Sequence, residues 1–178
     1  MLPRQGGNLF NIRDIVGNVT VNISDVRNQL SMNHLVKEKD YVFHLAGQVN
    51  HVDSMKNPLQ DLEINCQGTL VLLEALRHFN RDARVIFAGT RGEYGSSVSL
   101  PVDEDHPTNP KGVYAVTNLT AEKLVLVYDD VFKIKGICLR ITNTYGPRHQ
   151  MAHDEYGVFN WFIRKAMDNE EIPVMGDG

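Results

Sequence analysis

Two hydroxyl-bearing residues of this sequence stand where proton chemistry could take place. Thr90 follows the apolar run 84–88, at the end of an expected strand, where its hydroxyl could donate a hydrogen bond to a substrate oxygen. Tyr114 opens the next helical pattern, and its phenolate could accept a proton from an alcohol. Each residue alone also has a structural interpretation, Thr90 as a turn or capping hydroxyl and Tyr114 as a packing residue. A Thr at a strand end followed by a Tyr on the next helix is a less common combination than either residue alone.

The segment after the apolar run 41–45 is a candidate for ligand binding. It reads His-Leu-Ala-Gly-Gln-Val over residues 44–49, and the small residues Ala46 and Gly47 allow a ligand to approach the backbone closely. For this hexapeptide alone, a tight turn without a ligand is the simpler interpretation. Its position matters, because ligands of parallel α/β sheets bind beyond the carboxyl ends of the strands.

The glycines at 89, 92 and 95 have the GxxGxxG spacing of a dinucleotide-binding loop and also follow a predicted strand. Such a loop must open a helix whose free N–H groups bind the pyrophosphate. Here the chain continues into the Ser- and Pro-containing segment 96–101, which predicts a loop. We therefore assign no phosphate site to these glycines.

Alternating strands and helices are predicted to position these residues. Near-continuous apolar runs predict four strands, each buried on both faces, over residues 19–23, 41–45, 84–88 and 136–141. Apolar residues at helical spacing predict helices over 26–37 with a cap at Ser24 or Asp25, 59–79 with Pro58 at its start, 115–132 and 158–167. This alternation predicts an α/β fold with a Rossmann-like, doubly wound parallel sheet and helices on both faces.

The composition excludes several classes of protein. The 178 residues include 18 basic and 22 acidic residues, a net charge of −4, without the basic stripe that binds nucleic acid or an anionic membrane. No apolar run reaches the ~20 residues of a membrane span, and no signal peptide is recognisable. Cys66 and Cys138 are too few and too far apart for a disulfide framework or a zinc cluster. We expect a cytoplasmic protein with no metal site and no nucleic-acid or membrane partner.

Taken together, these motifs resemble the extended short-chain dehydrogenase/reductase family, the NAD-dependent nucleotide-sugar epimerases and dehydratases. The segment 145–162 most resembles the epimerase branch that includes the CDP-paratose 2-epimerases and UDP-glucose 4-epimerases. The matching motifs, in family order, are Asp25-Val26 after an early strand, His44-Leu45-Ala46-Gly47, Asn65 in NxxGT, Thr90 in T-x-x-x-Y-G, the acidic helix residue Glu122, and Asn143 and Arg148 in R-x-x-N-x-Y-G-P-R. Tyr114 stands at the position of the family's tyrosine.

The resemblance implies an enzyme that uses NAD to oxidise a nucleotide-sugar transiently and returns the hydride to the other face of the sugar. It implies a homodimer formed by the helices 59–79 and 115–132. Independently, the alternation of strands and helices, with polar residues after the strands, predicts that Asp25, Ala46, Thr90 and Asn143 gather at one edge of the sheet. The implied roles are catalytic for Thr90, Tyr114 and Asn118; cofactor-binding for Asp25, Val26, Leu45, Ala46, Gly47, Gln48, Asn65, Tyr114 and Asn118; and substrate-binding for Thr90, Asn143 and Arg148.

The sequence departs from the family pattern at chemically important positions. Asn118 stands where the family has the lysine that lowers the pKa of the catalytic tyrosine. Arg91 and Gly92 stand where the 4,6-dehydratases carry an Asp-Glu pair, with Glu93 one position late, which disfavours dehydratase chemistry. We expect residues 1–149 to form a partial NAD(P)-binding domain without the first β–α unit and its glycine-rich loop, and 150–178 to begin a truncated substrate-binding region. A catalytically silent binding module, or a fragment without function, is the alternative.

Overall fold

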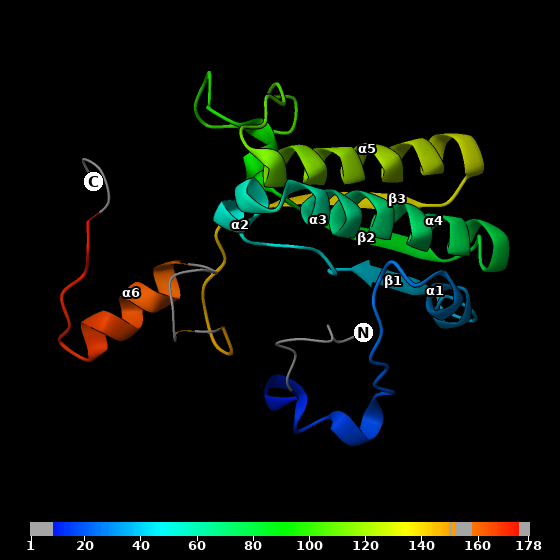
Figure 1. Ribbon diagram of the computed structural model, residues 1–178, viewed down its shortest axis with the longest axis horizontal. Coiled ribbons are helices and arrows are strands. Elements are labelled where there is room, and N and C mark those ends of the chain that lie inside the picture. Colours follow the sequence, from blue (N-terminus) through cyan, green and yellow to red (C-terminus); the bar gives the residue numbers. More distant parts are fainter. Residues whose placement is uncertain (1–8, 150, 152–157, 175–178) are drawn as a thin grey trace. The chain divides into compact units, whose positions relative to one another are not determined.

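The computed structural model describes residues 9–149, 151 and 158–174, and these fall into two compact units divided after Ile141. The first unit holds the sheet and most of the helices, and the second holds one helix, α6 (Figure 1). Among the described residues, no helix is long and apolar enough to cross a membrane.

A parallel three-stranded sheet forms the centre of the first unit. Its strands are β1 (Tyr41–His44), β2 (Arg84–Thr90) and β3 (Gly136–Ile141), in the order β1-β2-β3. His44 pairs with Phe87, and Thr90 pairs with Ile141. Because all strands run the same way, their carboxyl ends and the loops that follow them lie at one edge. The predicted α/β class with a parallel sheet is confirmed.

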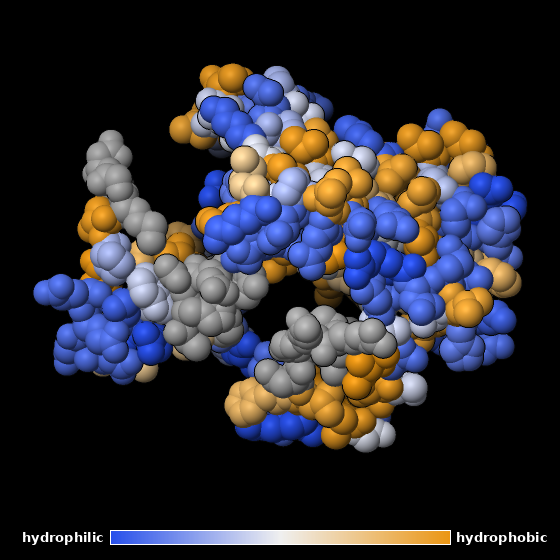
Figure 2. All heavy atoms as spheres, in the orientation of Figure 1, coloured by the Kyte–Doolittle hydropathy of each residue, from blue (hydrophilic) through white to orange (hydrophobic). Residues whose placement is uncertain are grey.

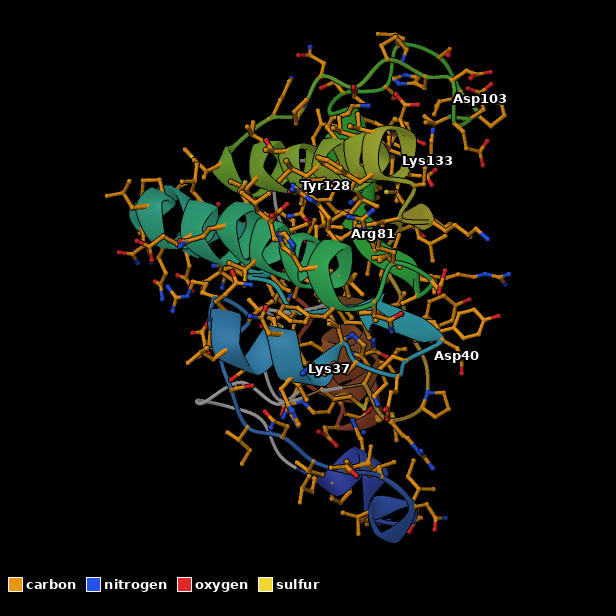
Figure 3. All side chains as sticks on the ribbon, turned by 90° about the vertical axis from the view of Figure 1, so that its right-hand side faces the viewer. Lys37, Asp40, Arg81, Asp103, Tyr128 and Lys133 are labelled. Atoms are coloured by element: carbon orange, nitrogen blue, oxygen red, sulfur yellow. The ribbon has the colours of Figure 1, made fainter. Side chains whose placement is uncertain are left out.

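Two long helices cover one face of this sheet. Helices α4 (Gly68–Phe79) and α5 (Val113–Phe132) run side by side in Figure 1, and α5 packs on β2 and β3. Tyr128 of α5 lies toward α4 (Figure 3), where its hydroxyl donates to Glu74 Oε1 at 2.5 Å. The core between helices and sheet consists of aliphatic side chains that are at most 1% exposed, including Leu73, Leu76, Val85, Val125 and Ile134. Burial of each such side chain contributes roughly 1.5–3 kcal/mol.

The predicted helix over 59–79 forms as three joined pieces. Helix α3 (Pro58–Leu62) begins at Pro58, as predicted, and passes through a π-helical turn, η3 (Glu63–Gln67), into α4. At the junction, a Cβ on Gly68 would come within 2.6 Å of Val26 Cγ1. The chain therefore needs glycine there to let the helix approach the segment that carries Val26.

The first predicted strand, 19–23, does not form. The chain makes two short 3-10 turns, η1 (Phe10–Ile12) and η2 (Val16–Asn18), and then a single bridge residue at Ile23. Val19, Val21 and Ile23 remain 42%, 38% and 68% exposed. An apolar run whose side chains find no covering surface gains too little from burial to pair as a strand.

The helix predicted over 26–37 is shorter in the structure. Helix α1 spans Gln29–Leu35 rather than 26–37, and its cap is Asn28, whose side chain accepts from the Ser31 N–H at 2.9 Å. Helix α5 begins at Val113, slightly earlier than predicted, and ends at Phe132 as predicted, where Lys133 caps it in a left-handed conformation (φ 60°). Helix α2 (His51–Lys56), capped by Asn50, has no counterpart among the predicted helices.

The sheet face away from α4 and α5 carries exposed apolar side chains within this unit, including Phe43 and Ile137, which are 65% and 60% exposed. The sequence predicts strands that are buried on both faces, and apolar residues do occur on both faces of the sheet. Within this unit, however, α4 and α5 cover only one of these faces. In the second unit, α6 (Val158–Met167) matches the predicted range.

Candidate active site

The carboxyl end of β1 opens onto a cavity of about 520 Å³. Its walls come from α1, from β1 and the residues after it, and from the segment before α1. Asp25 and Ala46 both line it, so the structure brings together two of the residues predicted to share one edge. The full lining is Ser24, Asp25, Val26, Met32, Leu35, Val36, Val42, Phe43, His44, Leu45, Ala46, Gly47, Ile64 and Leu72.

A smaller cleft of about 40 Å³ continues from this cavity, because both are lined by Leu45, Ala46 and Gly47. Gln48, Asn65, Tyr114 and Asn118 complete the predicted residues around the cleft. Seven of the nine predicted cofactor residues therefore surround one cleft, and the other two, Asp25 and Val26, line the adjoining cavity.

Asn65 holds the floor of the cleft in place. Its Oδ1 accepts the Gln48 N–H at 2.8 Å, and its Nδ2 donates to Thr117 Oγ1 at 3.1 Å and to Asp61 Oδ1 at 3.2 Å. A Cβ on Gly47 would come 3.0 Å from Asn65 Oδ1. The Asn65 amide thus links three segments: the π-helical turn that carries it, α5, and the loop that follows β1.

Thr90 and Tyr114 meet beside this cleft. Thr90 ends β2, and its Oγ1 accepts the Gly92 N–H at 3.2 Å. Burial raises the pKa of Tyr114 above its usual value; hydrogen bonding with the Thr90 side chain lowers it by less, and the charge of Asp61 raises it. The Tyr114 phenol therefore stays protonated at neutral pH.

Asn118 lies one helical turn after Tyr114 and is 7% exposed. Its Nδ2 donates to the Tyr114 backbone oxygen at 2.8 Å, within α5, and the side chain brings no charge to the phenol. The lysines on either side in sequence bind elsewhere, Lys111 to Ser96 at 2.8 Å and Lys123 to Glu122 at 3.4 Å.

His51 was missed by the sequence analysis. Its ring packs against that of Tyr114, with centroids 6.0 Å apart. A Cβ on Gly112, which has φ 86°, would come 2.6 Å from His51 Cε1. The glycine before α5 therefore makes room for the imidazole, and no motif or spacing in the sequence signals that contact.

Asp25 reaches the cavity with its charge already compensated. Its Oδ1 accepts from Arg27 Nε at 2.9 Å and its Oδ2 from Arg27 Nη2 at 2.7 Å, and Arg27 also binds Glu63 at 2.8 Å. The buried His44 ring binds Thr69 Oγ1 at 2.9 Å, and burial lowers its pKa to about 4, so it is neutral. Both side chains anchor the cavity wall.

Asn143 and Arg148 belong to the second unit, where both are exposed and Arg148 has φ 70°. In that unit Asn160, also missed from sequence, fixes the turn between them: its Oδ1 accepts the Gly146 N–H at 3.2 Å and its Nδ2 donates to the Thr144 oxygen at 3.4 Å. The assignment of Asn143 and Arg148 to substrate binding remains a prediction.

Comparison with known proteins settles which family has this arrangement. Residues 3–178 match the NAD dependent epimerase/dehydratase family. The chain belongs to that family. It is 37% identical to the putative UDP-glucose 4-epimerase of Methanocaldococcus jannaschii over 143 residues. The matched region covers 80% of this chain and 46% of the relative. It is 30% identical to the CDP-paratose 2-epimerase of Salmonella typhi, over 92% of this chain and 55% of the relative.

The fold agrees with solved members of the family. The UDP-glucose 4-epimerase of Thermus thermophilus in complex with NAD superimposes with a TM-score of 0.76 and 30% identity, covering 88% of this chain and 52% of that one. The chain thus spans about half the length of the relatives it matches. The resemblance stated from the motifs is confirmed at the level of the family.

Proposed function

We propose that the protein is an NAD-dependent epimerase of nucleotide-sugars. The observation that carries this proposal is the meeting of Thr90 and Tyr114 beside a cleft that continues into the cavity at the end of β1. A hydroxyl pair next to an elongated, largely apolar trough suits oxidation of an alcohol by a dinucleotide. Relatives named as epimerases of UDP- and CDP-activated sugars support the substrate class.

The described residues fit NAD along this trough. Asp25 and Val26 would hold the adenosine end, the backbone of Leu45–Gln48 would contact the middle, and Tyr114 with Asn118 would hold the nicotinamide end. The small side chains at 46 and 47 leave the backbone accessible, and a larger residue at 47 would crowd Asn65. When bound, NAD supplies reversible hydride transfer.

The chain's own residues supply positioning and one proton acceptor. Thr90 Oγ would hydrogen-bond the reacting sugar hydroxyl, and Tyr114 would take that hydroxyl's proton as a phenolate and return it later. Because the pKa of Tyr114 is raised and Asn118 adds no positive charge, we expect turnover to increase with pH on the alkaline side.

Epimerase chemistry is favoured over dehydration by the residues after Thr90. Elimination of water needs an acid/base pair on the sugar, and Arg91 and Gly92 stand at those positions. The next residue, Glu93, is fully buried and its carboxyl group faces Thr90 and Arg140. It therefore cannot contact a sugar in the cleft.

We also infer a homodimer that pairs the outer faces of α3–α4 and α5. Figure 2 shows apolar side chains among the hydrophilic ones over these helices. Leu59 is 76% exposed and Val127 and Val131 are 51% and 59% exposed, so both helical segments leave apolar side chains free for a partner. A cytoplasmic location also remains a prediction.

The proposal is tested by measuring bound cofactor and turnover in the natural protein. We expect NAD to be released on denaturation and detected by mass spectrometry, and UDP-glucose or a CDP-activated sugar to be epimerised. Tyr114→Phe should abolish turnover and retain NAD, whereas Tyr41→Phe, at the exposed strand edge, should change neither. NAD without turnover would favour a silent binding module, and absence of both would refute the proposal.

A further inference from the structure

Two glutamates share one arginine behind Thr90. Glu93 is 0% exposed and Glu122 is 3% exposed. Arg140 Nε lies 2.8 Å from Glu122 Oε2, Arg140 Nη2 lies 2.8 Å from Glu122 Oε1, and the same Nε lies 3.3 Å from Glu93 Oε2. The guanidinium therefore forms a bidentate ion pair with Glu122, and its contact with Glu93 is longer.

The charges of this cluster do not balance with both carboxyl groups ionised. Arg140 compensates one negative charge, and Lys123, which lies 3.4 Å from Glu122, is 56% exposed at its side chain and already screened by water. Glu93 Oε2 is buried and accepts no hydrogen bond. A buried carboxylate oxygen without a donor is costly, whereas a carboxylic acid there would have a donor to offer.

We propose that Glu93 is a neutral carboxylic acid in the folded protein, that it donates its proton to Glu122, and that in this form it positions Thr90. The cluster then consists of one neutral acid, one carboxylate and one guanidinium, with no net charge. Glu93 is a positioning residue, because it acts on the reaction through Thr90 and lies outside the cleft.

The link to Thr90 is direct. Glu93 Oε1 accepts the Thr90 N–H at 2.8 Å, while the Thr90 hydroxyl accepts the Gly92 N–H, which together form a capping box on the turn η4 (Arg91–Tyr94). A Cβ on Gly89 would clash with Glu93 Oε1. The strand end, its glycine and the acid thus fix where the Thr90 hydroxyl points. Because the role of Thr90 belongs to the proposed function, this part of the inference rests on that function.

The electrostatics of the cluster agree with this assignment. Burial and, next, the hydrogen bond with Glu122 raise the pKa of Glu93 to about 8, although the Thr90 N–H and the charge of Arg140 lower it by smaller amounts. Burial alone would raise the pKa of Glu122, but hydrogen bonds from Arg140 and Glu93 outweigh it and lower the pKa to about 2. The proton therefore resides on Glu93 at neutral pH.

The other groups that face the cluster do not supply a competing proton. The Tyr94 ring stacks on Arg140, with the guanidinium carbon 4.6 Å from its centroid. Burial raises the pKa of Cys138 to about 12 and also raises that of Tyr114, so both stay protonated and neutral near pH 7. Glu93 is thus the group of the cluster that changes charge between pH 5 and 9.

The test compares the thermal midpoint of unfolding with pH for the unmodified chain and Glu93→Gln, whose amide mimics the neutral acid. Unfolded Glu93 ionises near its ordinary value, so the folded state binds the extra proton between that value and about 8. The unmodified chain should lose stability across this window relative to Glu93→Gln. The two midpoints should be similar near pH 5, and Glu93→Gln should be several degrees higher at pH 8. The control Glu63→Gln, at the exposed ion pair with Arg27, should give a difference that does not change with pH.

A second measurement does not depend on the variant. Infrared difference spectra of the unmodified chain should show a protonated carboxyl band at pH 6 that disappears above pH 8. A Glu93→Gln protein that is less stable by the same amount at every pH, or that fails to fold while Glu93→Asp folds, would overturn the proposal, as would absence of the band. Neither readout uses epimerase activity, so loss of the proposed function alone would leave both results standing.

Discussion

Among single residues, Asn118 and Tyr114 matter most to the proposed chemistry of the cleft that both line. The Asn118 amide donates to the Tyr114 backbone oxygen and adds no charge near the phenol. Burial raises the pKa of that phenol. An ammonium group one helical turn away would favour the phenolate. The phenolate fraction at neutral pH rises about tenfold for each unit by which the pKa falls.

We therefore predict that Asn118→Lys raises turnover at pH 7 by about 10- to 100-fold and moves the alkaline rise of the pH–rate profile to lower pH. Ser97→Lys, which adds the same charge in an exposed loop, should leave the profile in place. Addition of Tyr114→Phe should remove the gain. A profile that Asn118→Lys does not move would mean that another group activates Tyr114, and the neighbouring His51 would be the first to test.

Motifs that fix both residue type and position predicted several residues that the structure places together. The family motifs assign Gln48, Asn65 and Tyr114 to cofactor binding, and all three line one cleft. Their role in that cleft stays a prediction. Glu93 was interpreted only as a displaced dehydratase acid. Its burial depends on Arg140 and Glu122, on two other elements, and that contact has no signature in the local sequence.

Among the elements, α3 and α5 carry apolar side chains on their outer faces, which are exposed, and α5 also packs apolar side chains of its inner face in the core. We predict that Val127→Glu weakens self-association by about 100-fold or more, because a carboxylate would be buried in the helix-to-helix contact. Sedimentation velocity would measure it. Val98→Glu, at a 77% exposed loop position, is the matched control. A natural protein that stays monomeric at high micromolar concentration would contradict the dimer itself.

Elements with a strong apolar period were predicted well, and those that depend on a covering surface were not. Helices 115–132 and 158–167 formed close to their predicted bounds, because their apolar residues recur at helical spacing along the whole segment. The run 19–23 has the residue types of a strand, but no neighbour covers it and only Ile23 forms a bridge. Helix α2 is six residues long and is set by the Asn50 cap, too short for a period to show.

At the scale of the whole molecule, the parallel order of β1, β2 and β3 explains why residues far apart in sequence meet. Parallel strands bring the segments after residues 44 and 90 to one edge, and α5 returns Tyr114 to that edge. The alternation of strand and helix patterns sufficed to predict this class. It could not predict which face of the sheet stays open, because that depends on which helices pack against it.

The proposed epimerase reaction inverts a sugar carbon by removing a hydride and returning it to the other face. Epimerisation of a nucleotide-sugar in D₂O, followed by NMR or mass spectrometry of the product, tests this most directly. A hydride that leaves and returns never exchanges with water, so we predict that the product carries no deuterium at the inverted carbon. Product that carries solvent deuterium there would show proton abstraction instead, and would contradict the roles assigned to Thr90 and Tyr114.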